Sequence, residues 1–430
     1  MRIRPAVIAA VLLTAIGVFL LRGKDRDMMA GYTPAPEPVA LNEILTNSLS
    51  EFPELKGMDA VIDSFMRAWS IRGISLSVMR NDSLLFSRGY GWADKEKGQP
   101  MTPGTTLRMA SVSKLITAVG IMKMQEEGLL NIQSPVFGPF GILNEYDRFI
   151  RDDRYFEMTV EHLLRHQAGF STDGGDPMFS TPAVMRRYGL TKAPDTQTLV
   201  RKLVSEPLAF DPGTFQQYSN FGYLLLSLVI EKISGMSYED YMQAYVLNPA
   251  GCYGFHIANN YLSERYPDET RYYMQPDAEP VREFNGSGRT VIRCYGGNDI
   301  HALSGAGAWV GSTPELARLI AVIDSDPALE DILDPFTIEQ MTTRLDDDTY
   351  PLGWVDCSLE GEWTRTGSFS GTSALVKRFP DGECWILITN TSTWRGSHFS
   401  RNTSELVRSL RPRYSASLPK RNLFYSPYNT

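Results

Sequence analysis

Ser111 and Lys114 lie three positions apart in the segment RMASVSKLIT, at the head of an apolar run. Residues three apart share one face of a helix, so the lysine amine can reach the serine hydroxyl. A helix start also favours the negative charge that develops on an attacking oxygen. The pair therefore predicts nucleophilic catalysis by Ser111 with Lys114 as its partner. For a serine considered alone, helix capping is the competing interpretation.

The spacing by itself is weak evidence, because a second S-x-x-K string occurs at Ser417–Lys420. Proline at 419 disfavours a regular helix there, so we expect the second string to be inert. The context of Ser111 must therefore supply the rest of the evidence.

A second candidate string is PGTFQQYSNFGYLLL, which contains the one Y-x-N triplet of the chain, Tyr218 and Asn220. A tyrosine flanked by cations ionises more readily and can then act as a base. The asparagine amide offers both a hydrogen-bond donor and an acceptor. Considered singly, these residues could equally be a core tyrosine and a turn former.

A third string, WTRTGSFSG, carries Arg365, Thr366, Gly367 and Ser368 on a predicted strand. Glycine allows a substrate to approach the backbone closely, and the amide that follows it could stabilise an oxyanion. The alternative interpretation of Arg365 is an exposed strand residue.

The elements that must position these strings are predicted from periodicity and turn signals. We expect a helix over 54–70, a hairpin that turns at Asn81-Asp82, and a helix over 113–127. Three predicted strands and a closing helix near 405–410 complete the predicted order of elements. The order predicts an α/β fold of the α+β type, in which one sheet is assembled from both ends of the chain around a mostly helical insert.

The three strings, in this order, resemble those of the serine β-lactamase and penicillin-binding superfamily. The class C branch, with its DD-peptidases and related esterases, is the most similar. Framework-like segments extend the resemblance from about 55 to 410: GLLNIQSPV, VEHLLRHQAGF, PGTFQQYSNFGYLLL and GAGAWVGSTPELARL. The resemblance implies the β-lactamase/transpeptidase-like fold, mainly an antiparallel sheet flanked by helices. The S-D-N triplet of class A does not fit.

The resemblance also implies roles. Ser111 would be acylated, while Lys114 and Tyr218 would share the general-base work. Asn220 would orient Lys114 and a substrate carbonyl. The backbone amides of Ser111 and Ser368 would form the oxyanion hole, beside Thr366 and Gly367.

Arg365 departs from the family pattern, which has lysine or histidine at this position. Guanidinium stays charged and cannot exchange protons at ordinary pH, but it can bind a carboxylate through two parallel hydrogen bonds. We therefore expect Arg365 to recognise a substrate carboxylate. The departure also leaves a rival open, a catalytically weak peptidoglycan- or peptide-binding protein of the same fold.

The implied substrates are D-amino-acid peptides, small esters or β-lactams, with peptidoglycan as a further partner. No metal or organic cofactor is expected. His162 and His166 have a metal-like spacing, but Leu163 stands where an H-E-x-x-H motif needs glutamate, and a packed pair is favoured. The net charge of −8, without a basic stripe, argues against nucleic-acid binding.

The first residues predict a membrane anchor and export. Arg2 and Arg4 precede an uncharged run over 5–21, and no good cleavage site follows. We expect segment 1–30 to be an uncleaved signal anchor, with the catalytic domain in the periplasm or outside the cell. Secretion after signal cleavage is the alternative.

The remaining boundaries follow from composition and from the extent of the resemblance. We expect a proline-rich linker over 31–53, the catalytic domain over 54–410 and a tail over 411–430. Within the domain, the sheet part should cover about 54–120 and 300–410, and the helical insert 121–299.

The four cysteines are Cys252, Cys294, Cys357 and Cys384. The family's sheet order would place two strands between Cys357 and Cys384, which is too far for a disulfide. If any disulfide forms, Cys252–Cys294 is therefore the expected pair.

Overall fold

A computed structural model of the chain describes residues 40–172 and 175–425. The predicted signal anchor and most of the predicted linker lie outside the described residues. Among the helices that are described, none combines the length and apolar character that a membrane crossing requires.

A seven-stranded sheet forms the centre of the fold, in the order β3-β2-β1-β12-β11-β10-β9. All neighbouring strands in it are antiparallel. Its members are β1 (Gly73–Arg80), β2 (Ser83–Asp94), β3 (Gln99–Pro100), β9 (Asp356–Cys357), β10 (Trp363–Phe369), β11 (Thr372–Arg378) and β12 (Glu383–Thr389). The β1–β12 pairing joins the first strand to the last, which confirms that both ends of the chain build one sheet.

Sequence signals explain the hairpins of this sheet. Asn81 and Asp82 both adopt positive φ, at 45° and 54°, in the two-residue turn between β1 and β2. Asn and Asp tolerate this left-handed conformation best among residues other than glycine. The predicted hairpin is confirmed at the predicted turn.

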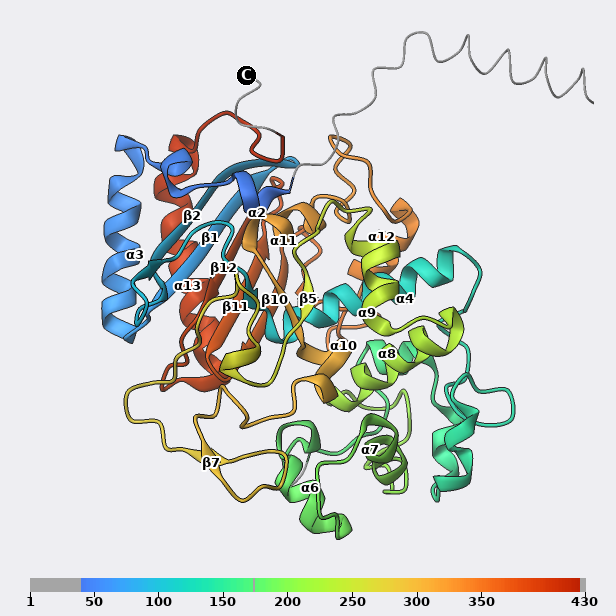
Figure 1. Cartoon of the computed structure of the whole chain (residues 1–430). Coiled ribbons are helices and arrows are strands. Elements are labelled where there is room, and N and C mark those ends of the chain that lie inside the picture. The colour runs from blue at the N-terminus through green and yellow to red at the C-terminus, as the bar shows by residue number, and fades with distance from the viewer. Residues whose placement is uncertain (1–39, 173–174, 426–430) are drawn as a thin grey trace, which may run out of the picture. The chain divides into compact units, whose positions relative to one another are not determined.

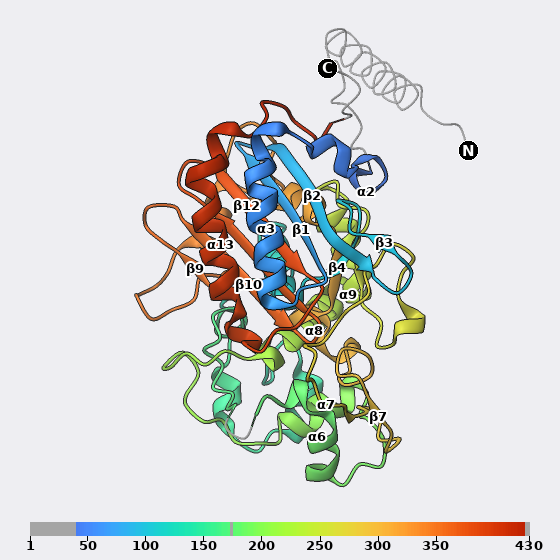
Figure 2. The ribbon, with the colours of Figure 1, turned by 90° about the vertical axis from the view of Figure 1, so that its left-hand side faces the viewer.

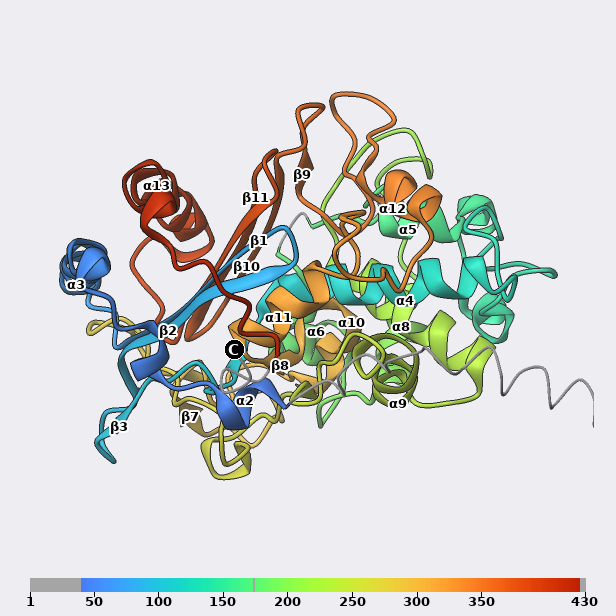
Figure 3. The ribbon, with the colours of Figure 1, turned by 90° about the horizontal axis from the view of Figure 1, so that it is seen from above.

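Helices cover both faces of the sheet (Figures 2 and 3). On one face lie α3 (Lys56–Trp69) and α13 (Phe399–Tyr414), whose buried residues include Ile62, Val407 and Leu410. On the other face lie α11 (Thr313–Ile320) and α4 (Ser113–Glu126). The sheet is therefore the middle of three layers, as an α/β domain requires in order to bury both of its faces.

Helix α4 is the axis of the helical side. Eleven of its residues are buried, from Ser113 to Met122 without interruption and then Met124. A helix that is apolar on every side must be enclosed by other elements. It packs against α8 (Asn220–Ser234) and α10 (Ser304–Gly307) (Figure 1). This enclosure fixes the position of the residues at its N-terminus.

The segment between α4 and α10 forms the predicted insert and is helical in its first part. The helices there are α5 (Val160–Leu164), α6 (Thr181–Tyr188), α7 (Thr196–Leu203), α8 and α9 (Tyr238–Met242). From about 253 to 299 the chain is mostly irregular, with short strands β5 (His256–Ile257), β6 (Val281–Arg282) and β7 (Thr290–Val291). Strand β5 joins β4 (Leu107–Arg108) and β8 (Trp309–Gly311) in a small separate sheet.

Both ends of the described chain are more structured than the predicted linker and tail. Leu41 and Leu45, in and after the short helix α2 (Leu41–Ile44), are buried in the core, although the linker was expected to extend to residue 53. After α13, Leu423 and Phe424 are each 2% exposed. Isolated apolar residues among polar ones give no periodicity, and this is why the sequence did not reveal their burial.

The predicted strand placement of Cys357 and Cys384 is confirmed, since β10 and β11 separate β9 from β12. All four cysteines are free and buried. The structure thus contains neither of the two pairings considered.

Candidate active site

Ser111 lies in the middle of a single 3-10 turn, Ala110–Val112, directly before α4. Ala110 has φ of 48°, a conformation that costs energy for a residue other than glycine. Ser111 itself is only partly buried, in contrast to the enclosed helix behind it. The strained turn thus presents the predicted nucleophile at the surface of a rigid core.

Lys114 is fully buried one turn further on. Its ammonium group lies 2.6 Å from Asn220 Oδ1, 2.5 Å from the carbonyl oxygen of Ala306 and 3.4 Å from Ser111 Oγ. Burial lowers the pKa of Lys114; nearby Tyr218 opposes this shift and Arg365 adds to it. Each of the three ammonium protons therefore has an acceptor, one of which is the nucleophile.

Tyr218 contacts both Ser111 and Lys114. Its hydroxyl donates to Ser111 Oγ over 2.8 Å, and Lys114 Nζ lies 4.8 Å from the centre of its ring. Burial would raise the pKa of Tyr218, but the positive charges of Lys114 and Arg365, together with hydrogen bonds to Lys114 and Ser111, outweigh burial and leave the pKa below its ordinary value. Tyr218 is therefore the group in contact with Ser111 that is best placed to accept its proton.

His166 packs behind Tyr218, with the two ring centres 4.3 Å apart. Its Nδ1 accepts a hydrogen bond from the Ser219 backbone N–H over 3.1 Å. Burial lowers the pKa of His166 far below its ordinary value, and Lys114 and Arg365 lower it further. A neutral imidazole without contact to Ser111 positions Tyr218 but does not add a charge to the site.

Asn220 is the first residue of α8, and Ser219 caps that helix through a hydrogen bond from the Gly222 N–H. The Asn220 amide oxygen accepts from Lys114, and its Nδ2 donates to Asp176 Oδ2 over 2.5 Å. Asp176 was not among the predicted site residues. The Asp-Pro pair that it begins is a turn signal, but nothing in the sequence spacing relates it to Asn220.

Arg365, which was expected to bind a substrate carboxylate, instead contacts the backbone of Ser111. The side chain is buried, with 1% of its surface exposed, and its Nε donates to the backbone carbonyl oxygen of Ser111 over 2.8 Å. One terminal nitrogen donates to the same oxygen. Two of the three guanidinium nitrogens therefore bind the nucleophile's own backbone. The carbonyl sits opposite Arg365 because β10 packs directly against the Ser111 turn.

Gly367 makes this packing geometrically feasible. A Cβ atom at this position would lie 2.3 Å from the Met109 carbonyl oxygen and 2.9 Å from the Ser111 backbone nitrogen. Strand β10 therefore runs past the amide that the family resemblance assigns to the oxyanion hole. Thr366 and Ser368, on either side of Gly367, are partly exposed.

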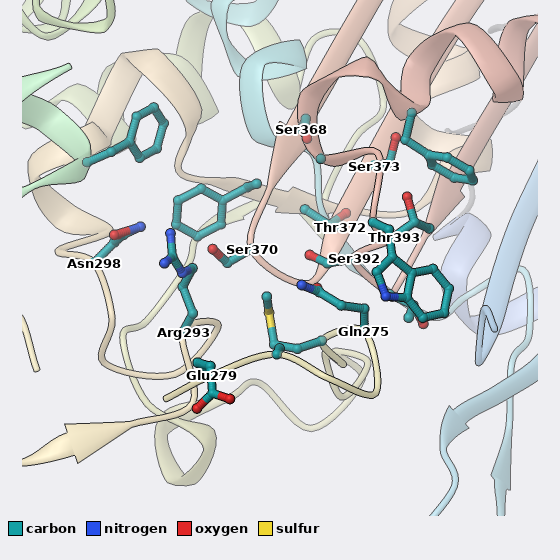
Figure 4. A pocket seen from close by; sticks show the side chains of 18 residues that line it. Gln275, Glu279, Arg293, Asn298, Ser368, Ser370, Thr372, Ser373, Ser392 and Thr393 are labelled. Atoms are coloured by element: carbon teal, nitrogen blue, oxygen red, sulfur yellow. The ribbon is translucent and has the colours of Figure 1, made fainter. Parts of the chain in front are cut away.

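A pocket of about 510 Å³ is lined by Ser368, the residue after Gly367 on β10 (Figure 4). The turn between β10 and β11 and the segment around Ser392 form one wall, and residues of the 274–298 segment face it. Half of the eighteen lining residues are neutral and polar, and six are apolar, three of them phenylalanines. Glu279 and Arg293 are the charged ones in the lining. This volume suits a small-molecule substrate portion.

The predicted metal-like pair has a structural explanation. His162 Nδ1 accepts a hydrogen bond from the Thr159 backbone N–H in a capping box at the start of α5, while His166 supports Tyr218. Within the described ranges 40–172 and 175–425, no group of three or more ligating side chains is arranged to hold a metal ion.

Comparison with known proteins agrees with this geometry. The family profile described as Beta-lactamase matches residues 58–407. The chain belongs to the β-lactamase family. The match includes Ser111, Lys114, Tyr218, Asn220 and Arg365, so all the residues gathered at the site lie inside the family domain.

Two curated members of the β-lactamase family are informative relatives. Penicillin-binding protein 4* of Bacillus subtilis is 28% identical over 50% of this chain and 45% of its own length. Esterase EstB of Burkholderia gladioli is 31% identical over 45% of this chain and 49% of its own length. The matches thus span less than half the length of either relative.

Solved structures of similar fold extend across most of the chain. D-amino acid amidase from Ochrobactrum anthropi is 19% identical, with a TM-score of 0.64 over 85% of this chain and 99% of its own. The octameric penicillin-binding protein homologue from Pyrococcus abyssi is 22% identical, with a TM-score of 0.60 over 84% of this chain and 77% of its own. At these identities the comparison establishes the fold, and it confirms the β-lactamase/transpeptidase-like architecture.

Proposed function

We propose that this chain is a serine hydrolase that transfers an acyl group from its substrate to Ser111 and then to water. The observation that carries the proposal is the contact of Ser111 Oγ with Tyr218, 2.8 Å away, and with buried Lys114, 3.4 Å away. A hydroxyl between an acidified phenol and an ammonium group can lose its proton as it attacks.

In the proposed acylation step, ionised Tyr218 removes the Ser111 proton while Oγ bonds to the acyl carbon. The charge moves to the former carbonyl oxygen, which the backbone N–H groups of Ser111 and Ser368 would stabilise. Collapse of the intermediate breaks the bond to the leaving group, and Tyr218 returns its proton to that group. Water then bonds to the acyl carbon while Tyr218 accepts its proton. The bond between that carbon and Ser111 Oγ breaks as Tyr218 returns the proton to Oγ, so that the acid product leaves and Ser111 is regenerated.

The substrate classes in this proposal are D-amino-acid peptides and amides, small esters and β-lactams. The pocket next to Ser368 would hold the part of the substrate adjacent to the reacting carbonyl. Its lining combines hydroxyl and amide side chains with aromatic ones, which suits a substrate portion that has both hydrogen-bonding and apolar groups. Relatives and structural neighbours with names from the penicillin-binding, esterase and amidase groups support the range without selecting within it.

The test is labelling with a fluorophosphonate, followed by peptide mapping and a panel of esters, D-peptides and β-lactams. We expect an adduct on Ser111, and we expect turnover to be abolished in Ser111→Ala. Ser417→Ala is the matched control, because Ser417 begins the other S-x-x-K string. Undiminished turnover in Ser111→Ala would refute the proposal. An adduct without turnover of any panel member would favour the rival peptidoglycan- or peptide-binding protein, and transfer to added amines would identify a transpeptidase.

We also propose that the chain is exported and held at a membrane by residues 5–21. The support is the uncharged run between flanking charges in the sequence. Fractionation of producing cells tests this proposal. A mature protein that begins near residue 25–32 in a soluble fraction would contradict the anchor.

A further inference from the structure

Asp176 ends a line of hydrogen bonds that starts at the nucleophile. Lys114 donates to Asn220 Oδ1 over 2.6 Å, and Asn220 Nδ2 donates to Asp176 Oδ2 over 2.5 Å. The other carboxylate oxygen, Oδ1, accepts from the Met178 backbone N–H over 2.9 Å. Both oxygens of Asp176 are thus engaged, one by the site and one by its own turn.

A carboxylate in this place removes an ambiguity in the site. A side-chain amide can rotate by half a turn and exchange its donor for its acceptor. An ionised carboxylate only accepts hydrogen bonds, so the Asn220 –NH₂ group must face Asp176 and Oδ1 must face Lys114. In the opposite orientation, amide hydrogens would face the ammonium, and Lys114 would lose an acceptor in a fully buried position.

The charge of Asp176 has a second effect. Lys114 and Arg365 are two buried cations next to Tyr218. Asp176 is the carboxylate that contacts this group through Asn220, and its charge favours the protonated form of Lys114. The removal of that charge would make the lysine easier to deprotonate.

The turn that carries Asp176 contacts the end of the sheet. Asp176 caps the 3-10 turn Pro177–Phe179, and the Phe179 ring lies 5.8 Å from the ring of Phe369 at the end of β10. The turn that carries the carboxylate thus has a ring contact with the strand that also carries Arg365.

We propose that Asp176 is a positioning residue of the acylation step, which fixes the orientation of the Asn220 amide and keeps Lys114 charged beside Ser111. This proposal rests on the proposed function. It adds to that function a residue that touches neither the nucleophile nor the base and acts through Asn220.

The first test is Asp176→Asn, which keeps the shape and removes the charge. With a neutral ester substrate, we expect kcat/KM to fall ten-fold or more, mainly through kcat. Because protonated Lys114 stabilises ionised Tyr218, the alkaline limb of the pH profile should also move to lower pH. A purely structural role would lower the whole profile without moving that limb. An unchanged rate and an unchanged limb would overturn the proposal.

A double variant that exchanges the residue types at 176 and 220 separates a defect in amide orientation from a defect in folding. Asn220→Asp alone would place two carboxylates against each other and should be strongly impaired. Asn220→Asp combined with Asp176→Asn restores one donor facing one acceptor, with an acceptor still toward Lys114. We expect the double variant to be at least ten-fold more active than Asn220→Asp. A double variant no better than the single one would overturn the orienting role.

Asp195→Asn is the matched control, because Asp195 also caps a helix, α7, through the Thr198 N–H and has no part in the site. Its kinetics should equal those of the wild type. The two proposals fail in different ways. If Ser111→Ala abolishes turnover but Asp176→Asn changes nothing, the positioning role alone is refuted; if Ser111→Ala remains active, the serine mechanism itself is refuted.

Discussion

The charge and the hydrogen bonds of Arg365 act on different parts of the site. Its charge lowers the pKa of Tyr218, after the larger contribution of Lys114, while its Nε and a terminal nitrogen hold the Ser111 carbonyl oxygen. Lysine would keep the charge but could not form both hydrogen bonds in the same plane. Glutamine would lose the charge as well. The two substitutions can therefore separate the two effects.

For Arg365→Gln we expect the acid limb of kcat/KM to move to higher pH. The sign follows from the lowered pKa of Tyr218: without the cation that pKa rises, and the base becomes ionised only at higher pH. Arg365→Lys should keep the limb near its wild-type position and lose about 1.5–3 kcal/mol of transition-state stabilisation. The measurement is a pH–rate profile for each variant.

The loss in either variant should be equal for neutral esters and for peptides with a free carboxylate, because Arg365 is buried against Ser111. This result would differ from the expectation based on sequence alone. A selective loss on carboxylate substrates would show instead that the guanidinium reaches the substrate during turnover.

Strand β10 can pack closely against the turn that bears Ser111 because Gly367 has no side chain. The carbonyl oxygen of Met109 occupies the space that a Cβ atom would need. Backbone cannot yield as a flexible side chain does. The separation of the two elements is therefore sensitive to a single methyl group.

Gly367→Ala should reduce kcat/KM by about a hundred-fold or more, because β10 must move away from Ser111 and carries the Ser368 amide with it. Gly222→Ala is the control, since a Cβ atom there would meet its nearest neighbours at 3.7–3.8 Å, an ordinary contact. The control should fold and react like the wild type. Ester turnover and thermal unfolding of both variants give the comparison, and an active Gly367→Ala would show that the strand does not need this close approach.

The segment after α13 is a second element whose importance the sequence did not reveal. Leu423 is 2% exposed, and its backbone N–H donates to the Leu84 carbonyl oxygen over 2.8 Å. Arg421 donates to the Leu85 carbonyl oxygen over 3.1 Å. These contacts attach the end of the described chain to the outer part of the sheet.

Leu423→Ala should lower the free energy of unfolding by about 2–4 kcal/mol, through lost burial and the cavity that remains. Leu359→Ala is the control, because Leu359 is fully exposed and should change stability by less than about 0.5 kcal/mol. Denaturant unfolding measures both. Equal stabilities for the two variants would mean that the segment does not contribute to the folded core.

The sequence predicted the elements with strong periodicity and the residues in distinctive triplets. Helix α3, the β1–β2 hairpin and the meeting of Ser111 with Tyr218 belong to this class. Asp176 could not be predicted, because its contact with Asn220 depends on how the insert folds back over α8. The partner of Arg365 was missed for a similar reason, since a strand's register and packing, rather than its residue types, decide which group the guanidinium meets.

At the scale of the whole molecule, one buried acid links stability to pH. Asp82, 1% exposed in the β1–β2 turn, lies near Asp324, Asp326 and Asp331. Burial first, and then Asp324 and Asp326, raise the pKa of Asp82 to about 8, although Leu329 N–H donates to Oδ2. Arg378 pairs with Asp324 and offsets part of the negative charge.

The difference in unfolding free energy between Asp82→Asn and the wild type should be smaller at pH 5 than at pH 9. At pH 9 the variant should be the more stable protein. Because the pKa is higher in the folded state than its ordinary value of 3.8, the wild type loses stability as pH rises from that value through about 8, where Asp82 must ionise in a negative environment. Asparagine tolerates the positive φ of this turn and cannot ionise. The difference at pH 9 should be on the order of 1 kcal/mol or more.

Thermal unfolding of both proteins between pH 5 and pH 9 tests this prediction. A stability difference that stays constant across that range would show that folding does not change the pKa of Asp82. Asp63→Asn, at an exposed position on α3, supplies a control for the general effect of a lost carboxylate.

The pairing of the first strand with the last also has a consequence in time. Arg80 and Glu383 are neighbours in the sheet but lie 303 positions apart in the chain. At about 5–20 residues per second, a ribosome needs roughly 15–60 s to make the intervening chain. During that interval the β1–β2 hairpin has an open edge and no partner. A nascent chain of this protein therefore cannot complete its sheet until β12 has been made, and throughout that interval its unpaired edge must be kept from the edges of other chains.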